Sequence, residues 1–456
     1  MVKVSPEVLT WSISKKLSFR FAFIFFILFI IFLDWSVNPF LPWFYYEGGL
    51  AEFLDGTIGW IGKNVFNVSY TLISPYDAQH NDRTYIYVLY FTMGAVSLLG
   101  TIIWSVSDRK RENYDVLYYW LTVIIRYYLA FTLFLFALEK FFKMQFPDLG
   151  YYVLSEPVGN LSPMSLAWAF FGYSYSYNVF IGIAESAALL LLFRRTTTLG
   201  AILTLGTLVN VMVVNYSYDV HAKLYPTALF VMTLFLLLPQ LGRIFRFFLT
   251  THPVSLQVMR TPVFAKPWIT TARLVVKVGI IGYVIILSVK DYVGYKNRRD
   301  SMEMSNAESG VPGIYEVNSF VVSNDTLSDE DPLRWREIVI GGARERIRLK
   351  DDSVAYANVS LSANEILVYG DRLKLAVNEQ EVYNELGLRE STYMEMDSIL
   401  VTRQIKSRFQ FVLTDSTTLF LKGRVNGDSV FITAKRRSFD IDDFRLMKAR
   451  FHWITE

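Results

Sequence analysis

Residues 117–140, LYYWLTVIIRYYLAFTLFLFALEK, decide what kind of protein this chain forms. The stretch is apolar and aromatic over a length that crosses the roughly 30 Å hydrocarbon core of a bilayer as an α-helix. It carries one charge in its interior, Arg126, and then the pair Glu139 and Lys140 at its end. The sequence therefore predicts a membrane protein, with Leu117–Ala137 as one span.

Six further apolar runs are long enough, and poor enough in charge, to be predicted spans. Together with the first they predict a polytopic bundle of about seven transmembrane helices: Phe19–Leu33, Ile86–Trp104, Val179–Phe193, Leu199–Val214, Thr227–Phe248 and Leu274–Val289. The long aromatic loop 35–83 contains another run, Ile58–Ile73, with Lys63 and two asparagines in it. This run is predicted to lie at the interface or to re-enter, and whether segment 57–75 enters the membrane stays open.

The composition agrees with a protein that faces two solvents. Of 456 residues, 52% are hydrophobic and 16% aromatic, with a mean hydropathy of +0.29. The net charge is +9 over residues 1–299 and −6 over residues 300–456. The absence of cysteine excludes disulfides, thiolate zinc sites and iron–sulfur clusters held by this chain. The basic residues form no continuous stripe, so nucleic acid is not an expected partner.

Basic residues in the short loops predict the orientation of the bundle. Thirteen lie in the N-terminal segment and the loops on its side of the membrane, and five lie in the alternate loops. The N-terminus is therefore predicted to be cytoplasmic and, with seven spans, the tail to be outside. The predicted location is a bacterial inner membrane, with a periplasmic C-terminal domain.

The last third of the chain changes pattern after Tyr295. Short segments with alternating apolar residues, such as GIYEVNSFVV and SVFITAKRR, predict antiparallel strands, and Asn426-Gly427 predicts a tight hairpin. The fold class is thus a helical bundle plus an all-β barrel or sandwich. The predicted organisation is two helices with an outer loop (1–114), a four-helix bundle (115–248), a cytoplasmic loop with the seventh helix (249–299), a linker (300–312) and the β domain (313–456).

Polar side chains inside the apolar runs are the candidate functional residues, because a lipid-facing surface would not keep them. They are Arg126, Glu139, Lys140, Glu185, Asn210, Asn215, Asp219 and His221. Arg126 lies roughly 13 Å into its span, so Glu185 on the next span is its predicted partner. Asn215 and Asp219 are predicted to share a helix face. The alternative is purely structural: a buried pair that fixes helix register, and asparagines that join helices.

Two family resemblances carry functional implications. Residues 115–248 resemble the DoxX-like four-helix membrane proteins, through Arg126 followed by FALEKF and through GIAESAALLLLF followed by Arg194-Arg195-Thr196-Thr197. The resemblance implies a membrane protein associated with redox partners or quinone, and it carries over Arg126, Lys140 and Glu185. The opening of the tail, Gly313-Ile314-Tyr315, loosely resembles lipocalin-type barrels.

A more distant resemblance is to vitamin K-dependent carboxylase-like membrane proteins, which also join a helical bundle to a β-rich tail. It implies that Lys140 holds the place of a base that acts on a hydroquinone. The paired catalytic histidines of that family are not recognisable in this chain, and neither a metal-binding nor a nucleotide-binding motif is present.

Two functions remain open from the sequence. The first is a component of an envelope membrane complex that docks protein partners or lipids through the bundle and the β domain. The second is a quinone-binding oxidoreductase, or an accessory subunit of one, in which a bound cofactor or partner supplies the electron carrier that a cysteine-free chain lacks. Whether the chain is an enzyme is left open.

Overall fold

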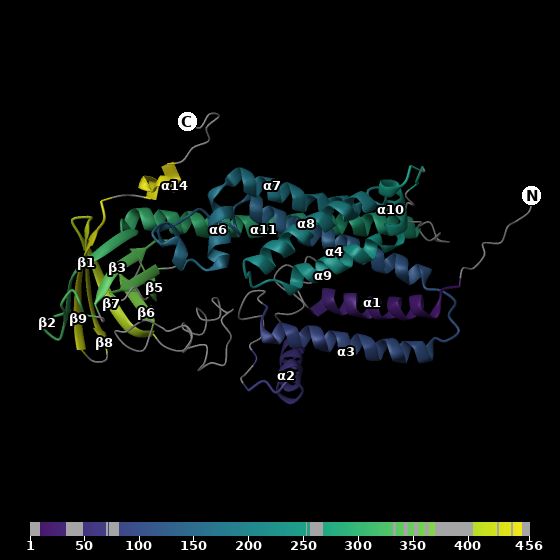
Figure 1. Cartoon of the computed structure of the whole chain (residues 1–456), viewed down its shortest axis with the longest axis horizontal. Helices are drawn as coiled ribbons and strands as arrows, with labels where there is room; N and C mark the ends of the chain where they lie inside the picture. Colours follow the sequence, from purple (N-terminus) through teal and green to yellow (C-terminus); the bar gives the residue numbers. More distant parts are fainter. Residues whose placement is uncertain are drawn as a thin grey trace, which may run out of the picture. The chain divides into compact units, whose positions relative to one another are not determined.

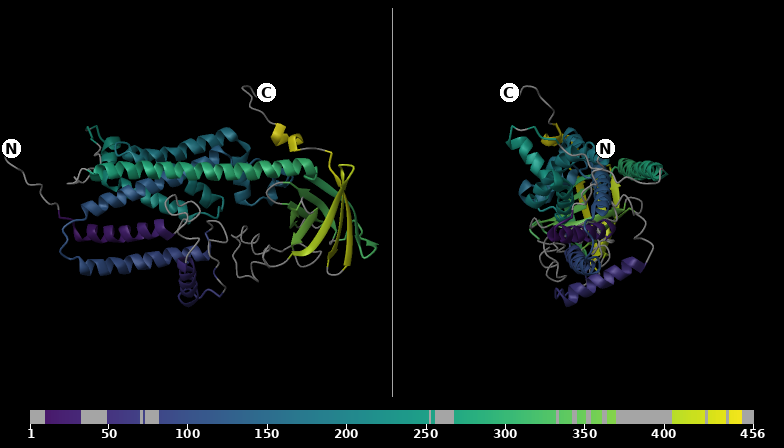
Figure 2. Two further views of the ribbon diagram at one scale, coloured as in Figure 1. Left: turned by 180° about the vertical axis from the view of Figure 1, so that it is seen from behind. Right: turned by 90° about the vertical axis from the view of Figure 1, so that its right-hand side faces the viewer.

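The computed structural model divides the chain into two compact units (Figures 1 and 2). The first comprises Met1–Gln145 and Tyr175–Tyr292, and the second Phe146–Ser174 and Val293–Glu456. The chain therefore passes from one unit to the other three times along its length. The structure describes residues 10–32, 49–69, 72, 82–251, 253–255, 268–331, 334–341, 345–350, 354–360, 364–369, 405–425, 428–438 and 441–448.

The first unit is helical. Its helices are α1 (Ile13–Phe32), α2 (Gly49–Asn64), α3 (Thr84–Ser107), α4 (Asp115–Phe141), α7 (Tyr175–Ser186), α8 (Thr197–Ser217), α9 (Leu224–Leu237), α10 (Leu241–Leu249) and the part of α11 (Trp268–Ser309) before Val293. Two short 3-10 helices extend the pattern, η2 (Ala187–Leu192) after α7 and η3 (Leu238–Gln240) after α9.

Five helical stretches of the described chain are long and apolar enough to cross a membrane. They are Thr84–Ser107, Asp115–Phe141, Tyr175–Leu192, Thr197–Ser217 and Leu224–Leu249. These stretches contain five of the seven predicted spans, except that Phe193, the last residue of the predicted span Val179–Phe193, lies just beyond Leu192. They confirm a helical membrane region.

The predicted number of seven spans is not reproduced among the described residues. The first and last helices of the first unit, α1 and α11, carry charged side chains along their apolar runs. The first predicted span coincides with α1, which contains Lys15, Lys16 and Arg20. The seventh lies in α11, where Lys277 and Lys290 interrupt the apolar run. Loop 35–83 contains α2, whose 16 residues are shorter than the roughly 20 that span a bilayer. Most of 70–81 lies outside the described residues.

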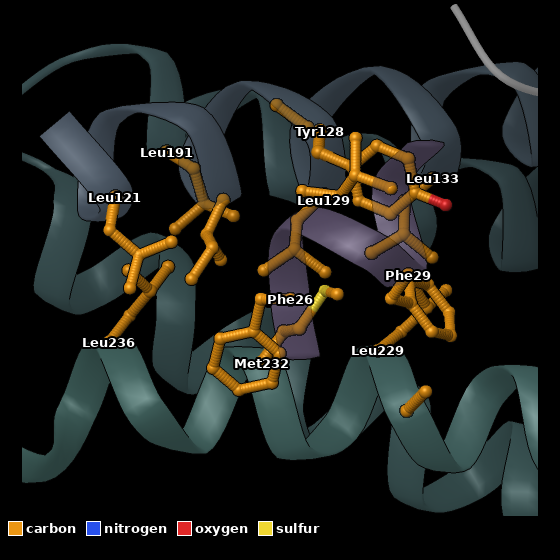
Figure 3. Close-up of a cluster of buried hydrophobic side chains, with 14 of the residues drawn as sticks. Phe26, Phe29, Leu121, Tyr128, Leu129, Leu133, Leu191, Leu229, Met232 and Leu236 are labelled. Carbon is orange, nitrogen blue, oxygen red and sulfur yellow. The ribbon is translucent and has the colours of Figure 1, made fainter. Parts of the chain in front are cut away.

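Helix α4 contributes the most to the core of the first unit. Its side chains Leu121, Ile125, Tyr128 and Leu129 are each 0% exposed. Figure 3 shows this cluster, in which α4 meets Phe26 and Phe29 of α1, Leu191 of η2 and three residues of α9, Leu229, Met232 and Leu236. A helix that is apolar on nearly every face is typical of a protein core or a membrane span, and α4, with 61% of its apolar stretch buried, packs against several neighbouring helices.

The second unit contains a curled antiparallel sheet. Its strands are β1 (Gly313–Val322), β2 (Asp325–Thr326), β3 (Trp335–Ile340), β4 (Glu345–Leu349), β5 (Val354–Ser360), β6 (Glu365–Tyr369), β7 (Ile405–Thr414), β8 (Thr418–Val425) and β9 (Asp428–Arg436). From β3 to β9 each strand pairs with the next, and β1 pairs with both β3 and β9, so that the pairings form a ring. The predicted antiparallel β domain is thereby confirmed.

One side of the sheet holds the core of the second unit. Trp335 lies between Phe320 and Phe409, with ring centroids 5.6 and 5.2 Å away. The other side of β1 and β3 is also covered, since Ile314 and Val339 are 2% and 0% exposed and pack with Tyr151. The elements outside the sheet are α5 (Tyr151–Leu154), η1 (Val158–Asn160), α6 (Pro163–Tyr173), η4 (Ile441–Asp443) and α14 (Arg445–Lys448).

One boundary of the tail differs in character from its prediction. Helix α11 continues to Ser309, so most of the predicted linker 300–312 is helical. Gly310 ends the helix with φ +63°, a conformation that favours glycine, and β1 begins at Gly313 as predicted. The predicted turn Asn426-Gly427 lies outside the described residues, but Val425 and Asp428 on either side of it are paired.

We expect Phe409→Ala to destabilise the sheet by about 3–5 kcal/mol, because it removes a fully buried aromatic ring. The matched control is Phe420→Ala on the adjacent strand, where the ring is 44% exposed and the loss should be below about 1 kcal/mol. Hydrogen–deuterium exchange of β7 and β8 amides in the detergent-solubilised full chain measures both. Equal effects of the two substitutions would contradict this assignment of the core.

Candidate functional site

The centre of the candidate site is an ion pair between α4 and α7. Lys140 Nζ lies 3.1 Å from Glu185 Oε1, and the two side chains are 6% and 2% exposed. Gly182, one turn before Glu185, allows the helices to approach, because a Cβ at this position would lie 2.7 Å from the ring of Phe141. Lys140 also lies 5.1 Å from the ring of Phe136, which provides a further favourable contact for its charge.

The pair is only partly satisfied. Glu185 Oε2 is buried and has no hydrogen-bond partner in the described part of the chain. A buried carboxylate usually accepts several hydrogen bonds, and an unused lone pair there is costly. The arrangement can therefore fix two helices to each other and still accept a hydrogen bond from a donor of suitable size.

The predicted pair of Arg126 with Glu185 is wrong. Arg126 Nε instead donates to the carbonyl oxygen of Leu191, at 2.7 Å, and its side chain is 2% exposed. The reason is the level of each group along the bundle: Arg126 and Lys140 are fourteen residues apart, about 21 Å along α4. Glu185 lies level with Lys140, and the end of η2 lies level with Arg126.

The change from α7 to the 3-10 helix η2 creates a second polar contact region. The last carbonyl groups of a helix have no partner within it and carry partial negative charge. Here three successive carbonyls receive donors: Leu190 from Thr196 Oγ1 at 2.7 Å, Leu191 from Arg126, and Leu192 from Lys277 Nζ at 3.1 Å. No local pattern in the sequence predicts this cap, because two of its donors, Arg126 and Lys277, lie far from η2 along the chain.

The remaining predicted residues do not join the ion pair. Glu139 neighbours Lys140 on α4, and its carbonyl accepts from Met144 N at 2.7 Å. Asn210 is exposed on α8. Asn215 Nδ2 donates to Ala222 O at 2.7 Å.

Asp219 and His221 lie in the turn between α8 and α9. Asp219 does not share a helix face with Asn215, because α8 ends at Ser217 and Asp219 has φ +49°. Its carboxylate instead accepts from Lys223 Nζ at 2.7 Å, which lowers the pKa of Asp219. His221 is 7% exposed, and its carbonyl accepts from Asp82 N at 2.6 Å.

Asp82 is a structural residue that the sequence did not reveal. Its two carboxylate oxygens accept from Lys223 N at 2.6 Å and Leu224 N at 3.0 Å, the free amides at the start of α9. An acidic cap at a helix N-terminus is favourable, although burial raises the pKa of Asp82. The distance in sequence, more than 140 residues, explains why no local capping pattern is visible.

A buried charge network holds the segment around Glu156 to strands β3 and β4 within the second unit. Arg346 is 0% exposed and bonds Glu156, Glu337 at 3.1 Å and Ser155 Oγ at 2.9 Å. Arg348 NH2 lies 3.0 Å from Glu156 Oε2. Burial raises the pKa of Glu337, and the nearby guanidinium groups of Arg437, Arg348 and Arg336 oppose this shift. The alternation in ERIRL predicts a strand, but not that its charged face is covered.

Comparison with known proteins gives a bacterial relative. The uncharacterized protein YwoB of Bacillus subtilis (strain 168) is 38% identical to the chain over 113 residues, which make up 25% of this chain and 71% of YwoB. No model of a known protein family matches the chain. No solved structure matches it. The similarity to YwoB therefore extends over most of the relative rather than over a short motif.

We expect Lys140→Met to destabilise the bundle by about 3–5 kcal/mol, because it leaves the Glu185 carboxylate buried without its partner. The double variant Lys140→Met/Glu185→Leu should lose less than the sum of the single variants. Equilibrium unfolding in mixed micelles measures the cycle. The control cycle of Arg126→Met with Glu185→Leu should be additive within about 0.5 kcal/mol, since the two residues are not paired. Coupling in the control cycle alone would contradict the structure.

In the second unit we expect Glu156→Ala to weaken the protection of β3 and β4 by about 2 kcal/mol or more, because two buried guanidinium groups lose a carboxylate. Hydrogen–deuterium exchange of the full chain measures the effect. Glu330→Ala is the matched control: Glu330 is 87% exposed and 3.6 Å from Lys350, so its loss should have little effect. Unchanged exchange in Glu156→Ala would show that the network does not stabilise the strands.

Proposed function

The chain belongs to the same family as YwoB, and we propose that it is a non-catalytic, DoxX-like component of an envelope membrane complex that docks protein partners or lipids. The observation that carries this proposal is how the buried and half-buried charged groups of the two units are used. Lys140 and Glu185 join two helices, Arg126 and Lys277 bind backbone carbonyls, and Arg346 binds the segment at Glu156. These contacts connect helices and strands within each unit. The outward-facing surfaces then remain for the docking of partners.

The proposed topology has seven spans, with α1 and α11 added to the five apolar helices. One charge of α1 supports this, since Arg20 donates to Tyr114 OH at 2.6 Å and to Asp108 O at 3.1 Å and is only 4% exposed. The balance of basic loop residues supports a cytoplasmic N-terminus and a β domain outside the cytoplasm, in the inner membrane of a bacterium.

Compartment-specific labelling tests this topology. A cysteine introduced at Ser416, in the exposed turn between β7 and β8, is the only thiol in the chain. It should react with a membrane-impermeant reagent applied from outside the cytoplasm. Labelling from the cytoplasmic side alone would overturn the proposed orientation.

The alternative function is quinone binding by an oxidoreductase or its accessory subunit. It is favoured by one observation: among the described residues, the buried Glu185 Oε2 beside Lys140 has no donor, and a quinol hydroxyl could donate to it. The chain would supply only the binding groups, and the quinone would supply the redox chemistry.

The decisive experiment is the identification of molecules that copurify with the full chain in mild detergent. A protein subunit or retained lipid without quinone supports docking. A stoichiometric quinone that is lost in Glu185→Leu but retained in the matched Asn210→Leu variant supports the alternative and overturns the non-catalytic proposal.

A further inference from the structure

Three basic side chains gather where η2 ends and the chain turns into α8. Arg126 and Lys277 donate to the carbonyls of Leu191 and Leu192, and Arg194 follows two residues later. The charges of Arg126 and Arg194 both act on Lys277, so the three groups lie within electrostatic range of one another. Arg126 lies on α4, Lys277 lies on α11, and Arg194 lies in the turn 193–196.

The cluster has an excess of positive charge. In the described part of the chain, none of the contacts of these three side chains involves a carboxylate. The partners of Arg126 and Lys277 are carbonyl groups at a helix C-terminus, which together correspond to about half of one negative charge. Three formal positive charges against that half charge leave about two and a half uncompensated. A partly buried cluster of this kind favours an anionic ligand.

The position of the cluster identifies the source of the anion. Arg194 is exposed in the turn between two membrane-crossing helices, where phosphate headgroups lie. Lys277 Nζ is 4.7 Å from the ring of Phe193, which is 56% exposed, and Leu274 one turn away is 62% exposed. An exposed apolar surface beside the charges can contact the acyl chains of a lipid. A free phosphate ion has no apolar group that would use this surface.

A second basic element lies on the same side of the membrane. The chain crosses once through α8 and returns through the stretch Leu224–Leu249, which ends on the side where η2 ends. Helix α10 forms the last part of this stretch and carries Arg243 and Arg246 together with exposed Phe247 and Phe248, so it brings two further basic groups to the same leaflet.

We infer that Arg194 and Lys277, with Arg126 fixed behind them, bind the phosphate of an anionic phospholipid from this leaflet. The inference rests on the proposed docking function and names the class of lipid. The Lys277 ammonium stays on the Leu192 carbonyl and contacts the phosphate with its remaining N–H groups, and the exposed Arg194 guanidinium contacts it from the turn.

The test is lipid binding by the purified full chain in mild detergent, measured by native mass spectrometry and by the shift of the thermal unfolding midpoint. The probes are phosphatidylglycerol, phosphatidylcholine with the same acyl chains, and inorganic phosphate. Phosphatidylglycerol should bind and stabilise preferentially. Equal effects of the two lipids, or an equal shift with inorganic phosphate, would overturn the inference.

The variants Arg194→Gln and Lys277→Gln should each lower the affinity for phosphatidylglycerol about fivefold, the contribution expected of one basic residue at an anionic surface. Arg195→Gln, at the exposed neighbouring position, is the matched control and should lower the affinity less than either variant, because Arg195 is not one of the charges that act on Lys277. If Lys277 only caps η2, its replacement will lower stability with no change in lipid preference, and this outcome overturns the inference.

Failure of this inference and failure of the proposed function can be told apart. Loss of lipid preference in the unsubstituted chain, with a protein subunit still copurifying, overturns the anionic lipid site alone. A stoichiometric quinone with retained phosphatidylglycerol preference overturns the non-catalytic function alone.

Discussion

A charged side chain that is removed from water needs a partner where it is buried, because an unpaired buried charge is costly. Both units of this protein are arranged around that requirement. In the bundle this constraint selects which helices lie together: Lys140 and Glu185 join α4 to α7, and they are two of the few groups able to specify register among apolar surfaces that are otherwise interchangeable. In the second unit the same constraint joins Glu156 to Arg346 and Arg348. Both units thus pair a buried charged group with a group of opposite charge.

Helix η2 shows how a local backbone change redirects buried charges. An α-helix continued through Leu192 would keep its carbonyls bonded internally until its final turn. The change to 3-10 geometry and the turn that follows instead present the carbonyls of Leu190, Leu191 and Leu192 to side chains from elsewhere. Two of the donors are cations from α4 and α11, which lie 65 and 85 residues from the carbonyls that they bind, so one short segment connects helices that are distant in sequence.

The sequence predicted most of the helices and the antiparallel sheet, but not the partners of the buried charged groups, for a physical reason. Apolar runs of about 20 residues and two-residue alternation are local patterns, so five spans and the antiparallel sheet could be read directly. The partner of a buried charge depends on the level at which helices meet, which no local pattern contains. Arg126 and Glu185 are on neighbouring spans and of opposite charge, yet the register places Lys140, not Arg126, beside Glu185. Asp82 and the start of α9 illustrate the same limit.

The second unit is assembled from two separate parts of the chain. It contains residues 146–174 from the middle of the helical region as well as the tail. The unit is therefore connected to the helices through three covalent joints, one of which lies within the continuous helix α11. Within the unit, the buried contacts of Glu156 with Arg346 and Arg348 hold the inserted segment to strands β3 and β4. Breaking a buried ion pair is costly, so the inserted segment is part of the fold of the sheet and more than a loop between two helices.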